Sequence, residues 1–149
     1  MPEAAGAPAD SERRVELDRI ALGQLRLRNE RGGELVLGTG DDAAFTPVEL
    51  LLAAVGGCTA MDVDYITSKR TEPVRFTVRV RGEKIRDGAG GNRMANLEVT
   101  FDLEFPDGAD GDAARGVVDR AIRQSHDRLC TVSRTVEAGT RVTTRRMRS

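Results

Sequence analysis

The chain has 149 residues, 32% of them charged, and a formal net charge of −1 at pH 7. That length fits one domain with a substantial hydrophobic core. The balance of acids and bases argues against a protein that binds nucleic acid through a basic surface. With four Phe, one Tyr and no Trp, the core must be mainly aliphatic.

The N-terminal residues have the composition of a tail. Residues 1–12 carry Pro, Ala and acids without an apolar stretch, so we expect a disordered tail and no signal peptide. Residues 13–149 then form the single domain. The longest nearly apolar run, residues 50–61, is shorter than the roughly 20 residues that a membrane span requires. We therefore expect no membrane segment and a cytoplasmic protein.

Three short strands are expected before the first helix, over residues 13–20, 23–29 and 34–37. Glycines mark the turns between them. The strongest helix signal follows at Thr46, where Thr-Pro-Val-Glu is a capping box with Pro at the first helical position. We expect this helix to run from residue 47 to about residue 68.

This predicted helix is apolar on nearly every face from Leu50 to Met61. A helix that is apolar all round must be covered on all sides, which a few short strands and one more helix cannot do. The pattern therefore predicts a second subunit.

Two segments alternate strictly between apolar and charged residues, as half-buried strands do. Residues 74–81 place Arg in most outward positions, and residues 97–105 place mainly Asp and Glu there. Opposite charges favour antiparallel neighbours, so we expect these strands to pair with both charged rows on one face. The glycine-rich residues 87–92 join them.

A second helix is predicted to start near Asp112 and to end at Cys130, followed by a last strand over residues 136–145. The order of strands, helix, strands, helix and strand predicts an α+β fold.

The side chains with the greatest potential for covalent chemistry are those of Cys58 and Cys130. In the cytosol such a pair is expected to be reduced, reactive or simply buried, and the chemistry of the residues alone leaves those alternatives open. Gly56-Gly57 indicates that a partner helix or a substrate approaches the backbone just before Cys58. Two Cys and one His are too few for a four-ligand zinc site, so we expect no metal.

The segment TPVELLLAAVGGCTAMDV, residues 46–63, resembles the first cysteine helix of the OsmC/Ohr family of osmotically inducible and organic-hydroperoxide-resistance proteins. SHDRLCTV, residues 125–132, resembles that family's second cysteine segment. The resemblance covers about residues 13–147. It implies an intertwined α+β homodimer, with antiparallel sheets packed on a central cysteine-bearing helix and active sites at the subunit interface.

The same resemblance implies a thiol-dependent reduction of organic hydroperoxides in oxidative-stress defence. Cys58 corresponds to the peroxidatic cysteine and Cys130 to the resolving cysteine. The family needs no bound cofactor, and a dithiol reductant, often lipoyl-bearing, restores the thiols. Two alternatives stand beside this reading: a non-enzymatic dimer that binds a small apolar ligand at the subunit interface, and a relic of the fold whose cysteines are structural.

The sequence departs from the hydroperoxide-resistance branch at Val48, where that branch carries Glu directly after the Pro. The nearest acid is Glu49, which one helical step turns by about 100°. Glu49 has a structural role in the capping box and is a weaker catalytic candidate. The Gly-Gly-Cys form resembles a different branch of the family.

Cys58 lies too far into its helix for the helix dipole to stabilise a thiolate, so a cation must do so. The family uses an Arg from the N-terminal strand region. Arg19, Arg26 and Arg28 are the candidates here, and Arg26 is the favoured one.

Overall fold

The computed structural model of the protein describes residues 11–148, so almost all of the tail predicted over residues 1–12 lies outside the described residues. Two compact units make up the chain, with the division between Leu50 and Leu51.

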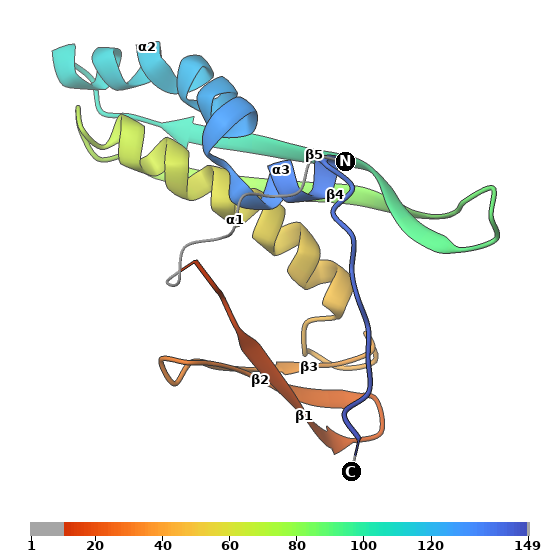
Figure 1. Ribbon diagram of the computed structural model, residues 1–149. Helices are drawn as coiled ribbons and strands as arrows, with labels where there is room; N and C mark the ends of the chain where they lie inside the picture. Colours follow the sequence, from red (N-terminus) through yellow and green to blue (C-terminus); the bar gives the residue numbers. More distant parts are fainter. Residues whose placement is uncertain (1–10, 149) are drawn as a thin grey trace. The chain divides into compact units, whose positions relative to one another are not determined.

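The first unit contains a three-stranded antiparallel sheet in the order β1-β2-β3 (Figure 1). Its strands are β1 (Val15–Ala21), β2 (Gln24–Asn29) and β3 (Glu34–Leu37). The predicted strands are confirmed to within two residues at each end. Gly23 adopts a φ of 73° in the turn between β1 and β2, which favours glycine there.

Helix α1 (Pro47–Thr67) starts at the predicted capping box. The Thr46 backbone N–H donates to Glu49 Oε1 at 3.1 Å, and the Glu49 backbone N–H donates to Thr46 Oγ1 at 3.2 Å. Both bonds satisfy donors that a helix start otherwise leaves without partners. The predicted helix is confirmed to within one residue.

The second unit contains a long antiparallel hairpin of β4 (Arg75–Arg86) and β5 (Asn92–Glu104), drawn in green in Figure 1. The predicted pairing of charged rows is confirmed. Arg75 bonds to Asp102 at 2.9 Å and Arg81 to Glu98 at 3.2 Å. These pairs are exposed and contribute little to stability, but they agree with the observed register. Both strands are longer than predicted and continue to the glycine-rich turn.

Helix α1 packs against this hairpin through Gly56. A Cβ built on Gly56 would lie 2.2 Å from Val80 Cγ2, so the helix and β4 approach too closely for any side chain. A Cβ on Gly57 would meet no heavy atom within 4 Å. What approaches the first glycine is therefore a strand of the same chain, whereas Gly57 faces open space.

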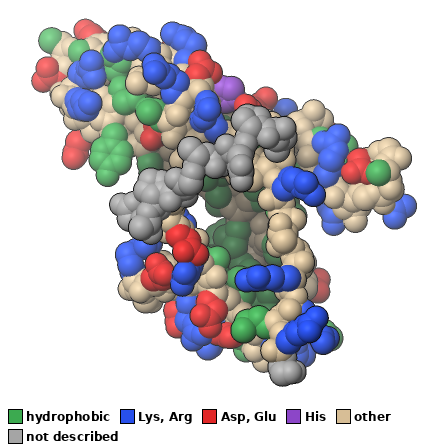
Figure 2. Space-filling model, viewed as in Figure 1, with side chains coloured by type: hydrophobic (Ala, Val, Ile, Leu, Met, Phe, Trp, Pro, Cys, Tyr) green, Lys and Arg blue, Asp and Glu red, His purple; other side chains and the backbone are tan. Residues whose placement is uncertain are grey.

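The C-terminal part of the second unit is helical. Helix α2 (Ala109–Gln124) runs into a π-helical turn, η1 (Ser125–Leu129), and α3 (Thr131–Glu137) follows. Ala114 and Ala121 face inward and are fully buried. The opposite side of α2 is charged, and Figure 2 shows Lys and Arg side chains gathered over this helix. The observed helix starts at Ala109, three residues before the predicted start at Asp112.

The strand predicted over residues 136–145 is wrong. Residues 136 and 137 complete α3, and residues 138–148 form no regular structure. Alternation alone predicts a strand, but a strand also needs a neighbour for its backbone N–H and C=O groups. No described strand pairs with this segment.

The apolar surface of the single chain is only partly buried. The largest fully buried side chains are Val63, Thr67, Ser125 and Cys130, whereas Met61 and Tyr65 of α1 are 67% and 78% exposed. By length and mean hydropathy, 1.3, α1 could cross a membrane. Its buried residues and its contacts with η1 and β4 instead identify it as the central helix of an α+β fold.

We expect Gly56→Ala to destabilise the protein and Gly57→Ala not to. The added methyl at residue 56 collides with a stiff β-branched Val80, and such overpacking costs about 1–3 kcal/mol. The same change at residue 57 finds open space and gains up to about 1 kcal/mol of helix propensity. Urea unfolding of both variants at one protein concentration measures the difference. Equal stability of the two variants would contradict the close approach of α1 and β4.

Candidate functional site

The structure brings the two predicted cysteines together within the second unit. Cys58 lies three turns into α1, and Cys130 lies between η1 and α3. Both are free thiols, and each influences the pKa of the other. Cys58 is half-buried, whereas Cys130 is fully buried, so the two sulfurs differ in their access to solvent.

The position of Cys130 is fixed by the π-helical turn before it. The Cys130 backbone N–H donates to Ser125 O at 2.7 Å. The buried Ser125 hydroxyl donates to Asp62 Oδ2 at 2.8 Å, and Asp62 lies one helical turn after Cys58 on α1. This bond anchors the Cys130 segment to the same turn of α1 that carries Cys58.

The Cys130 sulfur is surrounded by polar groups. Thr59 Oγ1 lies 3.4 Å from it, the Ser133 backbone N–H donates to it at 3.4 Å, and Ser133 Oγ lies 3.2 Å away. Cys130 is the N-cap of α3, and its sulfur takes the place of the oxygen that usually accepts a bond from the third residue of a helix. The sulfur can therefore accept several hydrogen bonds at once.

These bonds control the ionisation of Cys130. Burial is the largest single influence and opposes formation of the thiolate. The hydrogen bonds from Ser133, Thr59 and Cys58 together outweigh burial and hold the pKa of Cys130 below its usual value. Cys130 is thus the sulfur on which a negative charge is better stabilised.

Cys58 has the opposite balance. Burial raises the pKa of its thiol, and the neighbouring Cys130 sulfur raises it further. The backbone N–H groups of Val132 and Thr131 favour the thiolate, but they do not offset burial. The more accessible sulfur is therefore the less acidic one, as expected for a thiol without a cation beside it.

The other predicted site residues belong to the first unit. The Glu49 carboxylate accepts the Thr46 N–H in the capping box. Arg28 forms an ion pair with Glu16 at 3.5 Å, Arg26 is exposed on β2, and Arg19 lines a cleft. Which arginine serves the Cys58 thiolate, and whether Glu49 takes part in catalysis, both stay predictions.

Sequence reasoning missed the polar residues around Cys130, namely Thr59, Asp62, Ser125 and Ser133. The only sequence signal for them is local: Thr59 adjoins Cys58, and Ser133 follows Cys130 at capping-box spacing. His126 is exposed in η1, and contacts with Asp127 and Glu137 raise its pKa. It therefore links η1 to the end of α3.

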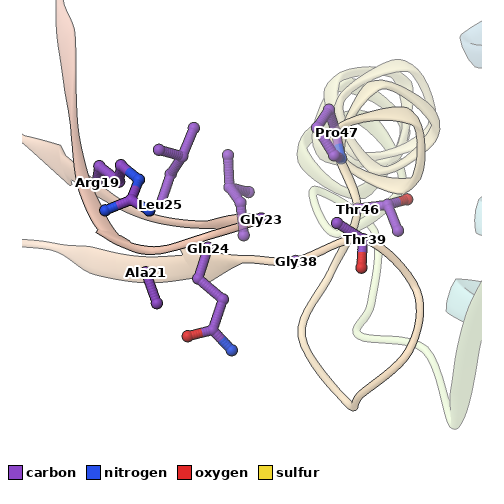
Figure 3. A pocket seen from close by; sticks show the side chains of 10 residues that line it. Arg19, Ala21, Gly23, Gln24, Leu25, Gly38, Thr39, Thr46 and Pro47 are labelled. Carbon is purple, nitrogen blue, oxygen red and sulfur yellow. The ribbon is translucent and has the colours of Figure 1, made fainter.

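A separate cleft of about 550 Å³ lies in the first unit. In Figure 3, Arg19 and Leu25 lie on one side, and Thr46 and Pro47, at the start of α1, lie on the other. Its walls also include Ala21 and Leu37. The cleft is thus largely apolar, with one cation among its lining residues.

Comparison with known proteins gives one family match, to the model described as "OsmC-like protein", over residues 38–145. An uncharacterised protein of Mycobacterium tuberculosis is 32% identical over 117 residues, which cover 77% of this chain and 82% of the relative. The family match spans both cysteine segments.

Solved structures are similar in fold at low sequence identity. An OsmC-like protein of unknown function from Vibrio cholerae superposes with a TM-score of 0.72 at 14% identity, covering 85% of this chain and 94% of the other. The organic hydroperoxide resistance protein OhrB of Bacillus subtilis has a TM-score of 0.57 at 11% identity, covering 83% and 90%. The predicted α+β fold with antiparallel sheets is confirmed.

We expect iodoacetamide to modify Cys58 and to spare Cys130 in the folded, reduced protein, because access outweighs acidity when a thiolate is buried. Modification of Cys58 should speed up from neutral to mildly alkaline pH, since its raised pKa leaves little thiolate at neutral pH. Peptide mass spectrometry with and without denaturant measures both sites, and Cys58→Ser is the control. Preferential labelling of Cys130 in the native protein would refute this assignment of access.

Proposed function

We propose that this chain reduces organic hydroperoxides in oxidative-stress defence. The chain belongs to the OsmC-like family, as the resemblance of its two cysteine segments predicted. The observation that carries the proposal is the cysteine pair itself. A half-buried thiol, Cys58, neighbours a fully buried one, Cys130, and hydrogen-bond donors surround the buried sulfur. The Bacillus subtilis protein of similar fold is named an organic hydroperoxide resistance protein, which supports the same chemistry.

The two cysteines have different roles in the proposed reaction. The Cys58 thiolate attacks the terminal oxygen of the hydroperoxide, the O–O bond breaks, and the alkoxide leaves and is protonated to the alcohol. Cys130 then attacks the resulting sulfenic acid of Cys58, an S–S bond forms, and the hydroxyl group leaves as water. A dithiol reductant, such as a lipoyl-bearing protein, reduces the disulfide by thiol–disulfide exchange. Both cysteines return to thiols, and the reductant becomes a disulfide.

Cys58 must first lose its proton, and its raised pKa makes this the demanding step. A guanidinium near the sulfur favours the thiolate. We assign that role to an arginine of β1 or β2, with Arg26 favoured and Arg19 and Arg28 as the alternatives. No bound cofactor is needed.

OsmC/Ohr proteins are generally known as dimers, and we propose that this chain forms a homodimer. The exposed apolar residues Met61 and Tyr65 of α1 support this. An exposed apolar face of this kind is typical of a subunit interface. Two free thiols in the functional pair suit the reducing cytoplasm, where we place the protein.

A second candidate function is binding of a small apolar ligand without turnover. The largely apolar cleft of the first unit supports it, since about 550 Å³ is within the range of small-molecule sites. Turnover of hydroperoxide decides between the two functions.

We expect the wild-type protein to consume an organic hydroperoxide such as cumene hydroperoxide with a dithiol as reductant. Cys58→Ser should abolish consumption because it removes the attacking sulfur. Cys130→Ser should allow a single oxidation and then stall, with sulfinic acid accumulating at Cys58. Peroxide assay and peptide mass spectrometry measure these outcomes. If the wild type keeps both thiols after excess hydroperoxide, the ligand-binding function takes precedence.

We expect Met61→Glu to weaken dimer formation, because it places a charge on the exposed apolar face of α1. Ala113→Glu on the exposed side of α2 adds the same charge elsewhere and is the matched control. Light scattering at micromolar concentration measures the mass of each variant. A monomeric wild type would rule out the homodimer.

A further inference from the structure

We propose that Thr59 and Ser133 are positioning residues for the resolving step, because together they hold the buried Cys130 sulfur as a hydrogen-bond acceptor aimed at Cys58. The inference rests on the proposed function for its chemical meaning. It rests on the geometry of the second unit for its physical basis.

Cys130 is fully buried, and a bare thiolate in such a place is costly. Three groups that can donate lie within 3.4 Å of its sulfur: the Thr59 hydroxyl, the Ser133 hydroxyl and the Ser133 backbone N–H. They come from two different helices, so they hold the sulfur from two sides. The lowered pKa of Cys130 agrees with this arrangement.

The Thr59 hydroxyl has two acceptors and one proton. Thr59 Oγ1 lies 3.4 Å from the Val55 carbonyl oxygen of its own helix and 3.4 Å from the Cys130 sulfur. A thiolate is the stronger acceptor because its bond to the hydroxyl is charge-assisted. When Cys130 becomes part of a disulfide, the sulfur loses that charge and the hydroxyl can return to the carbonyl. The Thr59 hydroxyl therefore has an acceptor in either state.

The hydrogen bonds stabilise a negative charge on Cys130, the sulfur that attacks in the second step. The Cys130 thiolate attacks the sulfur of the Cys58 sulfenic acid, the S–S bond forms, the S–O bond breaks, and the departing hydroxide takes a proton to become water. Because the donors stabilise the Cys130 thiolate, they speed disulfide closure relative to further oxidation of Cys58 by a second hydroperoxide. Thr59 and Ser133 thus protect the pair from overoxidation without touching the substrate.

The test compares Thr59→Val with Thr67→Val. Thr67 is also buried on α1 and donates to a carbonyl four residues back, Val63 O at 2.9 Å, but no described contact joins it to either cysteine. Thr59→Ser keeps the hydroxyl and serves as the rescue variant. Ser133→Ala removes the other side-chain donor.

The first measurement needs no hydroperoxide. In a Cys58→Ala background, the ultraviolet absorbance of the thiolate is titrated against pH, so that only Cys130 contributes. Loss of one donor to a charged acceptor is expected to raise the midpoint by about one pH unit or more in Thr59→Val and in Ser133→Ala. Thr59→Ser and Thr67→Val should leave it unchanged. An unchanged midpoint in Thr59→Val, or an equal rise in Thr67→Val, overturns the inference.

The second measurement follows the pair with both cysteines present and one equivalent of cumene hydroperoxide. Sulfenic acid at Cys58, trapped with dimedone, should form no more slowly in Thr59→Val than in the wild type. Disulfide closure should be about tenfold slower. Equal slowing of both steps indicates general damage to the fold and overturns the positioning role. If the wild type does not react, the proposed function fails, and the titration alone still decides whether Thr59 and Ser133 hold the Cys130 thiolate.

Discussion

The second unit depends on one contact, between a single turn of α1 and the segment that carries Cys130. Thr59 reaches the Cys130 sulfur, and Asp62 accepts the hydroxyl of Ser125. Because these α1 residues are three apart, they lie on one side of the helix and hold the segment at two points. Gly56, one turn earlier, lets the same helix pack directly on β4. The hairpin, the central helix and the C-terminal helices therefore converge on the cysteine pair.

The two thiols of the pair differ in solvent access and in acidity. Cys58 is half-buried and the more accessible, whereas Cys130 is fully buried but the more acidic, because several hydrogen-bond donors surround its sulfur. A buried thiolate cannot meet a bulky substrate, and an accessible thiol without a cation does not ionise readily. A peroxide-reducing site would need a positive charge beside Cys58, which is the role that we propose for an arginine.

The parts of the fold that were predictable are those whose signal is local. The capping box at Thr46 and Glu49 sets the start of α1 because its hydrogen bonds join residues three apart. The hairpin was predictable because alternation and opposite charge rows both specify a register. The strand expected over residues 136–145 failed because pairing needs a neighbour that alternation does not supply. The π-helical turn at Ser125–Leu129 was missed because widening a helical turn by one residue leaves no compositional trace.

The site shows the same division between local and distant information. A family resemblance can identify Cys58 and Cys130, but the donors around the second sulfur come from α1 and α3, which only the folded chain brings together. The segment that they hold is also part of the core, since Cys130 and Ser125 are among its largest fully buried side chains. A polar group buried there without partners would destabilise the unit. The hydrogen bonds that keep the Cys130 segment folded are therefore the ones that prepare its sulfur for reaction, so a change that relaxes the packing around η1 alters the chemistry of the pair as well.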